Sequence, residues 1–109
     1  MKPKALMQRT LALGDIDQAI TRYLEQEAPA AALGFVEALE RAYTHISKNP
    51  ATGSPRYAHA LSIPELRSWP LSKYPYFVFY VERSEHIDVW RVLHMKRDIP
   101  AWMADDADF

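Results

Sequence analysis

The sequence contains no cysteine among its 109 residues. Disulfide bonds and thiolate metal sites are therefore excluded, which fits a reducing compartment. Long apolar runs are also missing. The opening MKPKALMQRTLAL is interrupted at Gln8, Arg9 and Thr10, so it is a poor signal peptide, and no later segment approaches the roughly 20 apolar residues of a membrane span. We therefore expect a cytoplasmic protein that does not enter a membrane.

An excess of positive charge is missing as well. The chain has thirteen Lys and Arg residues and fourteen Asp and Glu residues, which gives a net charge of −1. Proteins that grip nucleic acids through many phosphates are usually basic, because counterion release supplies much of their affinity. We expect no direct sequence-specific binding of nucleic acid. The length predicts a single domain over residues 1–109.

Glycine is scarce, and proline separates the periodic segments. Apolar residues recur at helical spacing in two stretches on either side of Pro29: Ile16, Ala19, Ile20, Tyr23 and Leu24 in the first, and Leu33, Val36, Leu39, Tyr43 and Ile46 in the second. Asp15 and Gln18 resemble a capping box for the first helix, with Thr10 as a rival cap. The pattern predicts an antiparallel helical hairpin up to residue 49.

The remaining segments have the composition of strands. Residues 4–9 are a weak first strand, 49–65 are a proline-rich loop, and 66–71, 76–82 and 86–94 are rich in aromatic and β-branched residues. Pro70 cannot donate to a ladder, which indicates an edge strand. A short helix and a frayed acidic tail (104–109) follow. We predict an α+β fold in which the hairpin covers one face of a mainly antiparallel sheet of three to four strands.

The sheet has apolar residues on both faces, although one hairpin covers only one. Along the last strand, Ile87, Val89, Arg91 and Leu93 alternate with Asp88, Trp90, Val92 and His94. The second face is therefore covered either by the chain itself or by a partner. Trp102, on the short last helix, is a candidate to cover part of it.

The stretch RVLHMKRDIP (91–100) concentrates the chemically active side chains: His94, Lys96, Arg97 and Asp98. The other histidines have no metal-ligand spacing, and there is no glycine-rich phosphate loop and no activated nucleophile. We therefore expect no metal and no cofactor.

Four segments in the same order resemble the ParE/RelE superfamily of toxins from type II toxin–antitoxin modules. They are DIDQAITRY, NPATGSPR, LRSWPL followed by YFVFYVE, and IDVWRVLHMKRDIP. The pattern is closer to the ParE, or plasmid-stabilisation, branch than to the RelE nuclease branch. The resemblance implies a RelE/ParE-like fold and an antitoxin partner. ParE-type toxins inhibit DNA gyrase by binding, whereas RelE-type toxins cut mRNA on the ribosome, and the fold alone does not choose between them.

On the nuclease alternative, His94 would be the general acid or base, and Arg67, Arg91 and Arg97 would stabilise the phosphate. A structural interpretation explains the same residues. Arg91 is held by a carboxylate or by backbone carbonyls, His94 forms a hydrogen-bonded corner, Asp98 caps the last helix and Arg97 pairs with an acidic neighbour. The segment YPYFVFY lacks the basic residue that the nuclease branch carries there, so whether the chain is an enzyme stays open, with binding favoured.

The binding hypothesis assigns two surfaces. We expect the target, by resemblance DNA gyrase, to contact the end of the last strand and the terminal helix at Arg91, His94, Lys96, Arg97 and Trp102. In this superfamily the antitoxin wraps the toxin with its C-terminal segment. We expect it to cover the hairpin and the second sheet face, with contacts at Trp69, Tyr76, Phe77, Phe79 and Trp90.

Overall fold

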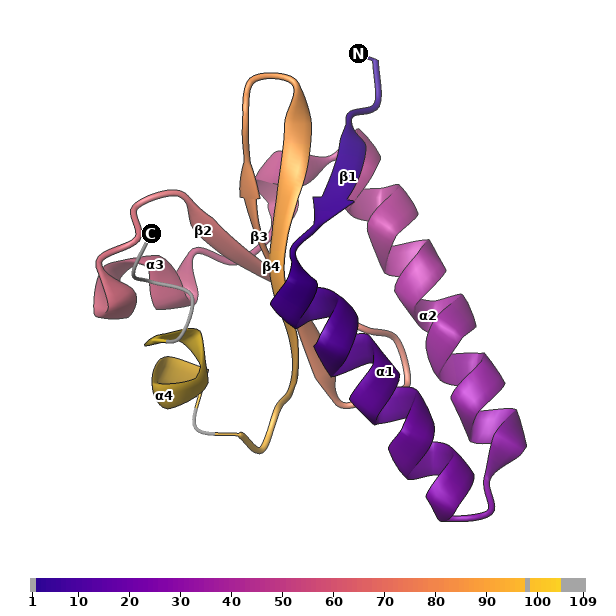
Figure 1. Cartoon of the computed structure of the whole chain (residues 1–109). Coiled ribbons are helices and arrows are strands. Elements are labelled where there is room, and N and C mark those ends of the chain that lie inside the picture. The colour runs from indigo at the N-terminus through magenta and orange to yellow at the C-terminus, as the bar shows by residue number, and fades with distance from the viewer. Residues whose placement is uncertain (1, 98, 105–109) are drawn as a thin grey trace.

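The computed structural model describes residues 2–97 and 99–104. The chain runs through β1 (Ala5–Gln8), α1 (Thr10–Glu25), α2 (Pro29–Lys48), the 3-10 turn η1 (Pro50–Thr52) and α3 (Arg56–Leu61), and then through β2 (Leu66–Pro70), β3 (Tyr76–Glu82), β4 (His86–His94) and α4 (Ile99–Ala104). Figure 1 shows three layers: the α1–α2 hairpin on one side of the sheet, and the short helices α3 and α4 on the other. The predicted α+β class and hairpin are confirmed.

The sheet has four strands in the order β1-β4-β3-β2. β1 pairs with β4 in parallel, and the other two pairings are antiparallel. β2 is an edge strand, as Pro70 predicts. Ser54 closes part of this edge, because it exchanges two backbone hydrogen bonds with Ser68 at 2.8 and 2.9 Å. The opposite edge is β1.

The first helix begins earlier than the capping-box prediction placed it. α1 starts at Thr10, and its N-cap position is Arg9, which makes no side-chain capping bond. The capping-box prediction for Asp15 is wrong, because Asp15 lies inside the helix and its carboxylate points to β4, where it binds Arg91. A carboxylate whose oxygens bind an arginine on a distant strand cannot also cap the N-terminus of its own helix.

The predicted apolar faces of the hairpin are only partly correct. Leu24 and Leu33 are 53% and 61% exposed, whereas Phe35 is fully buried. The buried positions are dominated by small residues: Ala12, Ala19, Ala32, Ala38 and Ala42. Small side chains let packed elements approach closely, so steric fit decides which side of each helix faces inward, and the more hydrophobic leucines lie outside it.

The segment predicted as a loop, 49–65, contains the two short helices η1 and α3. Their stability comes from tertiary contacts, since isolated helices of this length are marginal. The Tyr80 hydroxyl donates a 2.6 Å hydrogen bond to the Pro50 carbonyl, and Ala58 of α3 is buried in the second core cluster. Such long-range contacts leave no periodic signal in the loop itself.

A β-bulge in β4 overturns the simple alternation predicted for this strand. Arg91 is opposite Phe79 and Val89 is opposite Tyr80, so Trp90 is the extra residue. One inserted residue exchanges the faces of everything beyond it. Accordingly, Ile87, Val89 and Val92 belong to the cluster under the hairpin, whereas Leu93 joins the cluster under α3 and α4.

The chain itself covers much of the second sheet face. Leu66, Phe79 and Val81 form one core cluster with Ile99 and Met103 of α4. The predicted helix-capping role of Asp98 and the frayed tail beyond residue 104 lie outside the described residues. In the described part of the chain, no helix combines the length and apolar character needed to span a membrane.

Candidate functional site

The centre of the site is an ion pair between α1 and β4. The Arg91 side chain is 3% exposed and donates from Nε and Nη2 to the two carboxylate oxygens of Asp15, at 2.8 and 2.7 Å. The backbone N–H of Val92 donates to the same carboxylate at 3.0 Å. This bidentate geometry, with a third donor, is the arrangement in which a buried carboxylate is best satisfied.

Arg91 also holds the terminal helix in place. Its Nη1 donates to the backbone carbonyl of Trp102 at 2.9 Å, and its guanidinium carbon lies 5.5 Å from the indole centroid. The Arg91 side chain therefore connects β4 to both α1 and α4. The interpretation of Arg91 as an arginine held by a carboxylate and a carbonyl is confirmed. The expectation that Arg91 contacts a target directly stays a prediction; in this structure the side chain is enclosed.

His94 ends β4 and forms the corner predicted for it. Its Nδ1 accepts a 3.0 Å hydrogen bond from the backbone N–H of Lys96, which leaves the proton of the neutral ring on Nε2. The Tyr76 ring packs edge-on against it, with centroids 5.1 Å apart. Burial lowers the pKa of His94 below its ordinary value, and three nearby cations lower it further: Arg22, Lys96 and Arg97.

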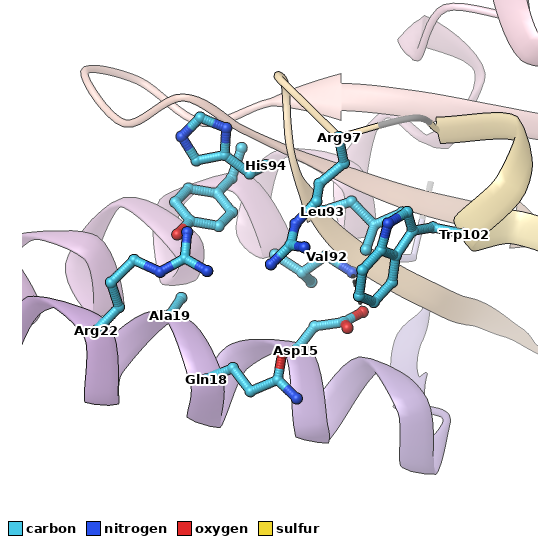
Figure 2. Close-up of a pocket in the computed structure, with 10 residues that line it drawn as sticks. Asp15, Gln18, Ala19, Arg22, Val92, Leu93, His94, Arg97 and Trp102 are labelled. Atoms are coloured by element: carbon cyan, nitrogen blue, oxygen red, sulfur yellow. Dashed lines mark hydrogen bonds between the residues drawn. The ribbon is translucent and has the colours of Figure 1, made fainter.

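A small pocket lies between α1 and the end of β4, with a volume of about 20 Å³. Figure 2 shows Arg22 and Gln18 projecting from α1 and Arg97 and Trp102 from the opposite wall. Arg97 lies over the Trp102 ring, with its guanidinium carbon 4.4 Å from the centroid. The predicted acidic partner of Arg97 is not found among the described residues, where this cation–π contact takes its place.

Of the four residues of the nuclease alternative, Arg91, His94 and Arg97 lie near one another at the end of β4, and Arg67 lies apart. Arg67 lies on edge strand β2, opposite Tyr80, and donates to the Gly53 carbonyl at 2.7 Å. His94 is opposite Tyr76, which lies four residues before Tyr80 on β3. At the usual rise of a strand, the positions of Arg67 and His94 are therefore offset by roughly 13 Å along the strand direction. Only His94 and Arg97 line the same pocket. Lys96 is exposed beside it.

The five aromatic residues expected to bind the antitoxin are distributed differently from the prediction. Tyr76, Phe79 and Trp90 are buried within the chain, so they are not available as contacts on an open sheet face. Trp69 and Phe77 are partly exposed. Trp69 stacks on His45 at 4.0 Å near the β2 edge, and Phe77 packs against Tyr57 of α3. The α3–α4 layer covers the face of Phe79 and Trp90, whereas Tyr76 is buried under the hairpin, where its ring packs against Phe35.

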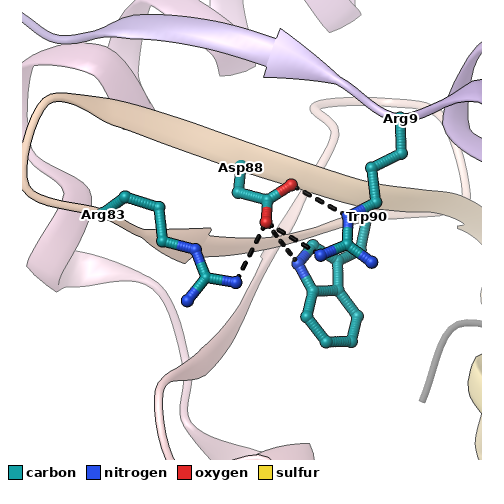
Figure 3. A network of polar contacts seen from close by, with 4 residues as sticks. All are labelled: Arg9, Arg83, Asp88 and Trp90. Atoms are coloured by element: carbon teal, nitrogen blue, oxygen red, sulfur yellow. Dashed lines mark hydrogen bonds and ion pairs between the residues drawn. The ribbon is translucent and has the colours of Figure 1, made fainter. Parts of the chain in front are cut away.

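A second polar network occupies the other half of β4 (Figure 3). Asp88 accepts hydrogen bonds from Arg9 at 3.0 and 2.9 Å, from Arg83 at 3.1 Å and from the Trp90 indole at 3.1 Å. The Arg9 guanidinium also lies 4.0 Å from the Trp90 centroid. Burial by itself raises the pKa of Asp88, but these hydrogen bonds and the Arg9 charge outweigh it, so the pKa is lowered overall.

Sequence reasoning missed Asp15, Arg22 and Asp88. Asp15 left a weak signal, because a carboxylate at the start of the apolar stripe of α1 has to be buried with it and therefore needs a cation. Arg22 lies one helical turn beyond Gln18 on the same face, and only the packing of α1 against β4 places it beside His94. No local pattern indicates that proximity.

Comparison with solved structures identifies the fold. The chain is similar to a solved structure described as the chromosomal ParDE toxin–antitoxin system from P. aeruginosa, with a TM-score of 0.71 and 18% identity, over 88% of this chain and 100% of that chain. At this identity the likeness shows the fold. No curated protein matches the sequence significantly.

A family model settles the affiliation. The model of the ParE toxin of type II toxin–antitoxin systems, parDE, matches residues 6–99, which include most of β1, the other three strands, both long helices and the pocket residues of α1 and β4. The chain belongs to the ParE toxin family. The ParDE context implies a cognate antitoxin as its partner.

Proposed function

We propose that this ParE-type toxin acts in the cytoplasm by binding DNA gyrase and blocking its function, and that a cognate antitoxin neutralises it by covering its surface. The observation that carries the proposal is the state of Arg91. Inside the protein, the Arg91 guanidinium donates hydrogen bonds to the Asp15 carboxylate and to the Trp102 carbonyl. It therefore supports a surface and is not available to a scissile phosphate.

The state of His94 supports the same proposal. A general acid needs a protonated ring, but burial and neighbouring cations lower the pKa of His94. A general base needs a free ring nitrogen, but in the neutral ring Nδ1 is occupied by the Lys96 N–H and Nε2 carries the proton. The imidazole is thus poorly suited to either catalytic role, whereas it is well suited to shaping a binding surface.

The target-binding surface that follows consists of His94, Lys96, Arg97 and Trp102, with Arg91 supporting them from below. All four are at least partly exposed, and they lie at the end of β4 and on α4. An aromatic ring with adjacent cations is the kind of composition that dominates binding energy at protein interfaces.

The antitoxin surface is best supported on the hairpin side of the molecule. β1 is a sheet edge, and a shallow groove of about 320 Å³ runs between β1 and α2, lined by Lys4, Ala5, Leu6, Tyr43, Thr44, Ser47 and Lys48. Large apolar side chains are exposed on β1 and the two helices: Met7, Leu11, Leu13, Leu24 and Leu33. An antitoxin segment that adds a strand at β1 and lays an apolar helix along the hairpin would bury them.

This surface has a direct test. The substitution Leu33→Glu places a charge on an exposed position, so the fold should be retained while the affinity for the antitoxin, measured by calorimetry, falls at least about tenfold. Ala60→Glu, also exposed but on α3 at the other side of the sheet, is the matched control and should have little effect. Equal affinities for both variants would argue against this surface.

The target is tested by inducing the toxin without its antitoxin and following two readouts in the same cells. Loss of DNA supercoiling and DNA damage, with transcripts intact, are the results expected for gyrase inhibition. Rapid codon-linked cleavage of transcripts on translating ribosomes would instead establish the nuclease alternative, for which the shared pocket of His94 and Arg97 is the supporting observation.

A further inference from the structure

The pocket at the end of β4 contains an uncompensated pair of guanidinium groups. Arg22 of α1 and Arg97 both line it, and within the described residues neither side chain has a hydrogen bond or ion pair with a carboxylate. The one carboxylate in the pocket wall, Asp15, has both oxygens occupied by Arg91 and by the Val92 N–H. The pocket is therefore positive, although the chain as a whole is not.

The two cations are placed as an anion would need them. Arg22 comes from a helix and Arg97 from the turn after β4, so they approach the pocket from opposite walls (Figure 2). Stacking over Trp102 engages the face of the Arg97 guanidinium and leaves N–H donors along its edge. His94, whose neutral ring carries a proton on Nε2, adds a further donor group to the lining.

The size of the pocket restricts the ligand. A volume of about 20 Å³ holds one water-sized group, whereas pockets for small-molecule ligands are typically about 300–1,000 Å³. A nucleotide base does not fit. The end of one acidic side chain does, and Arg–carboxylate pairs have both the strength and the geometry for such a contact. A nucleic-acid backbone would also require a longer track of cations than the two arginines that line this pocket.

We propose that this pocket is a receptor for a single carboxylate, and that the carboxylate belongs to an Asp or Glu side chain of the toxin's protein target, which inserts between Arg22 and Arg97. The assignment of that side chain to the target rests on the proposed function. The existence of a carboxylate site does not rest on that function. An experiment can therefore contradict the identity of the partner without contradicting the site.

The site is tested first without any partner. The pKa of His94 is measured by NMR on the full chain in chloride, in acetate as a mimic of an acidic side chain, and in phosphate, at constant ionic strength. The groups facing His94 are Arg22 from α1, Tyr76 from β3, and Lys96 and Arg97 from its own turn. An anion bound among them stabilises the imidazolium, so acetate should raise the pKa of His94.

The matched variants are Arg22→Gln and Arg97→Gln, with Arg41→Gln as the control, because Arg41 is exposed on α2 outside the pocket. Each pocket variant should abolish the acetate response, and the control should keep it. No acetate response in the native chain would overturn the site. A response to phosphate without a response to acetate would overturn the carboxylate assignment.

The partner is tested next with purified gyrase. Arg22→Gln and Arg97→Gln should weaken toxin binding by about tenfold or more, the usual cost of losing a charge-assisted hydrogen bond, while Arg41→Gln binds normally. A native acetate response combined with unchanged gyrase affinity would overturn the assignment to this target and leave the site standing. Absence of gyrase binding by the native toxin would count against the proposed function instead.

Discussion

Two carboxylates serve β4 in different ways. Asp15 reaches the strand from α1, is almost completely buried, and binds one arginine that continues to α4. Asp88 belongs to the strand itself and is almost as buried, but its partners Arg9 and Arg83, from the flanking segments, have side chains that are 25% and 42% exposed. The first network lies behind the proposed target surface, and the second joins β1 to the β3–β4 turn. The comparison indicates that the burial of the arginine partner, more than the number of hydrogen bonds to the carboxylate, distinguishes the ion pair behind the site from the network at the other half of β4.

The largest effect is expected when Arg91 is replaced. Arg91→Met leaves the Asp15 charge buried without its cation and releases the Trp102 carbonyl, so the free energy of unfolding should fall by about 3–5 kcal/mol. Denaturant unfolding measures the change. Arg67→Met, which loses a hydrogen bond to a backbone carbonyl, is the control and should cost about 1 kcal/mol. Similar losses in the free energy of unfolding for the two variants would show that the buried arginine contributes no more to stability than the peripheral one.

Removing both members of the buried pair sharpens the comparison. Asp15→Leu combined with Arg91→Met leaves no uncompensated charge, so the double variant should recover a large part of the stability that either single variant loses. A coupling energy of about 1–3 kcal/mol in a double-mutant cycle is the expected result. Simple additivity would show that the two side chains contribute independently.

A smaller effect is expected at Asp88. Asp88→Asn should cost about 1–2 kcal/mol at neutral pH, because the carboxylate gives up charge-assisted hydrogen bonds while the partner arginines Arg9 and Arg83 stay partly exposed to solvent. The pKa of Asp88 is lowered in the folded protein. Its contribution is therefore fully present above the ordinary pKa near 3.8 and is lost as the pH falls through the lower folded pKa.

The pH dependence distinguishes the variant from the native chain. The native protein should lose stability between pH 4 and lower values more steeply than Asp88→Asn does, as measured by unfolding at a series of pH values. Parallel pH profiles for the two proteins would mean that Asp88 has the same pKa in the folded and unfolded chains.

The smallest effect is expected at the partly exposed pair formed by Lys4 and Glu82, whose charged atoms are 2.7 Å apart. Glu82→Gln should change the free energy of unfolding by no more than about 0.5 kcal/mol, since solvent and salt screen such pairs. A loss of stability as large as that of Asp88→Asn would show that the contribution of these ion pairs follows the distance between the charged atoms and not their burial.

The sequence predicted the fold well wherever local periodicity carries the information. The hairpin, the three C-terminal strands and the edge position of β2 follow from spacing and from Pro70. The faces of the helices did not follow, because Leu24 and Leu33 outrank alanine in hydrophobicity and yet lie outside the packed interface. The bulge at Trp90 was equally hidden, since its cause is the pairing with Phe79 and Tyr80.

The site was predicted less completely than the fold. His94 and Arg97 lie in one pocket, as their place after the last strand indicates, and Arg91 is held as a buried arginine should be. Their partners Asp15 and Arg22 are more than 70 residues away in the sequence. Contacts of that range arise when α1 packs on the sheet, and a single sequence contains no record of them.

The most direct test of binding without cleavage uses the purified full-length toxin in two parallel reactions, gyrase supercoiling of a relaxed plasmid and translation of a defined message. The native toxin should inhibit supercoiling while the message stays intact, and His94→Ala should lose only part of the inhibition. Cleavage of the message by the native toxin, reduced about 10²-fold or more in His94→Ala, would contradict the proposal and identify His94 as a catalytic group.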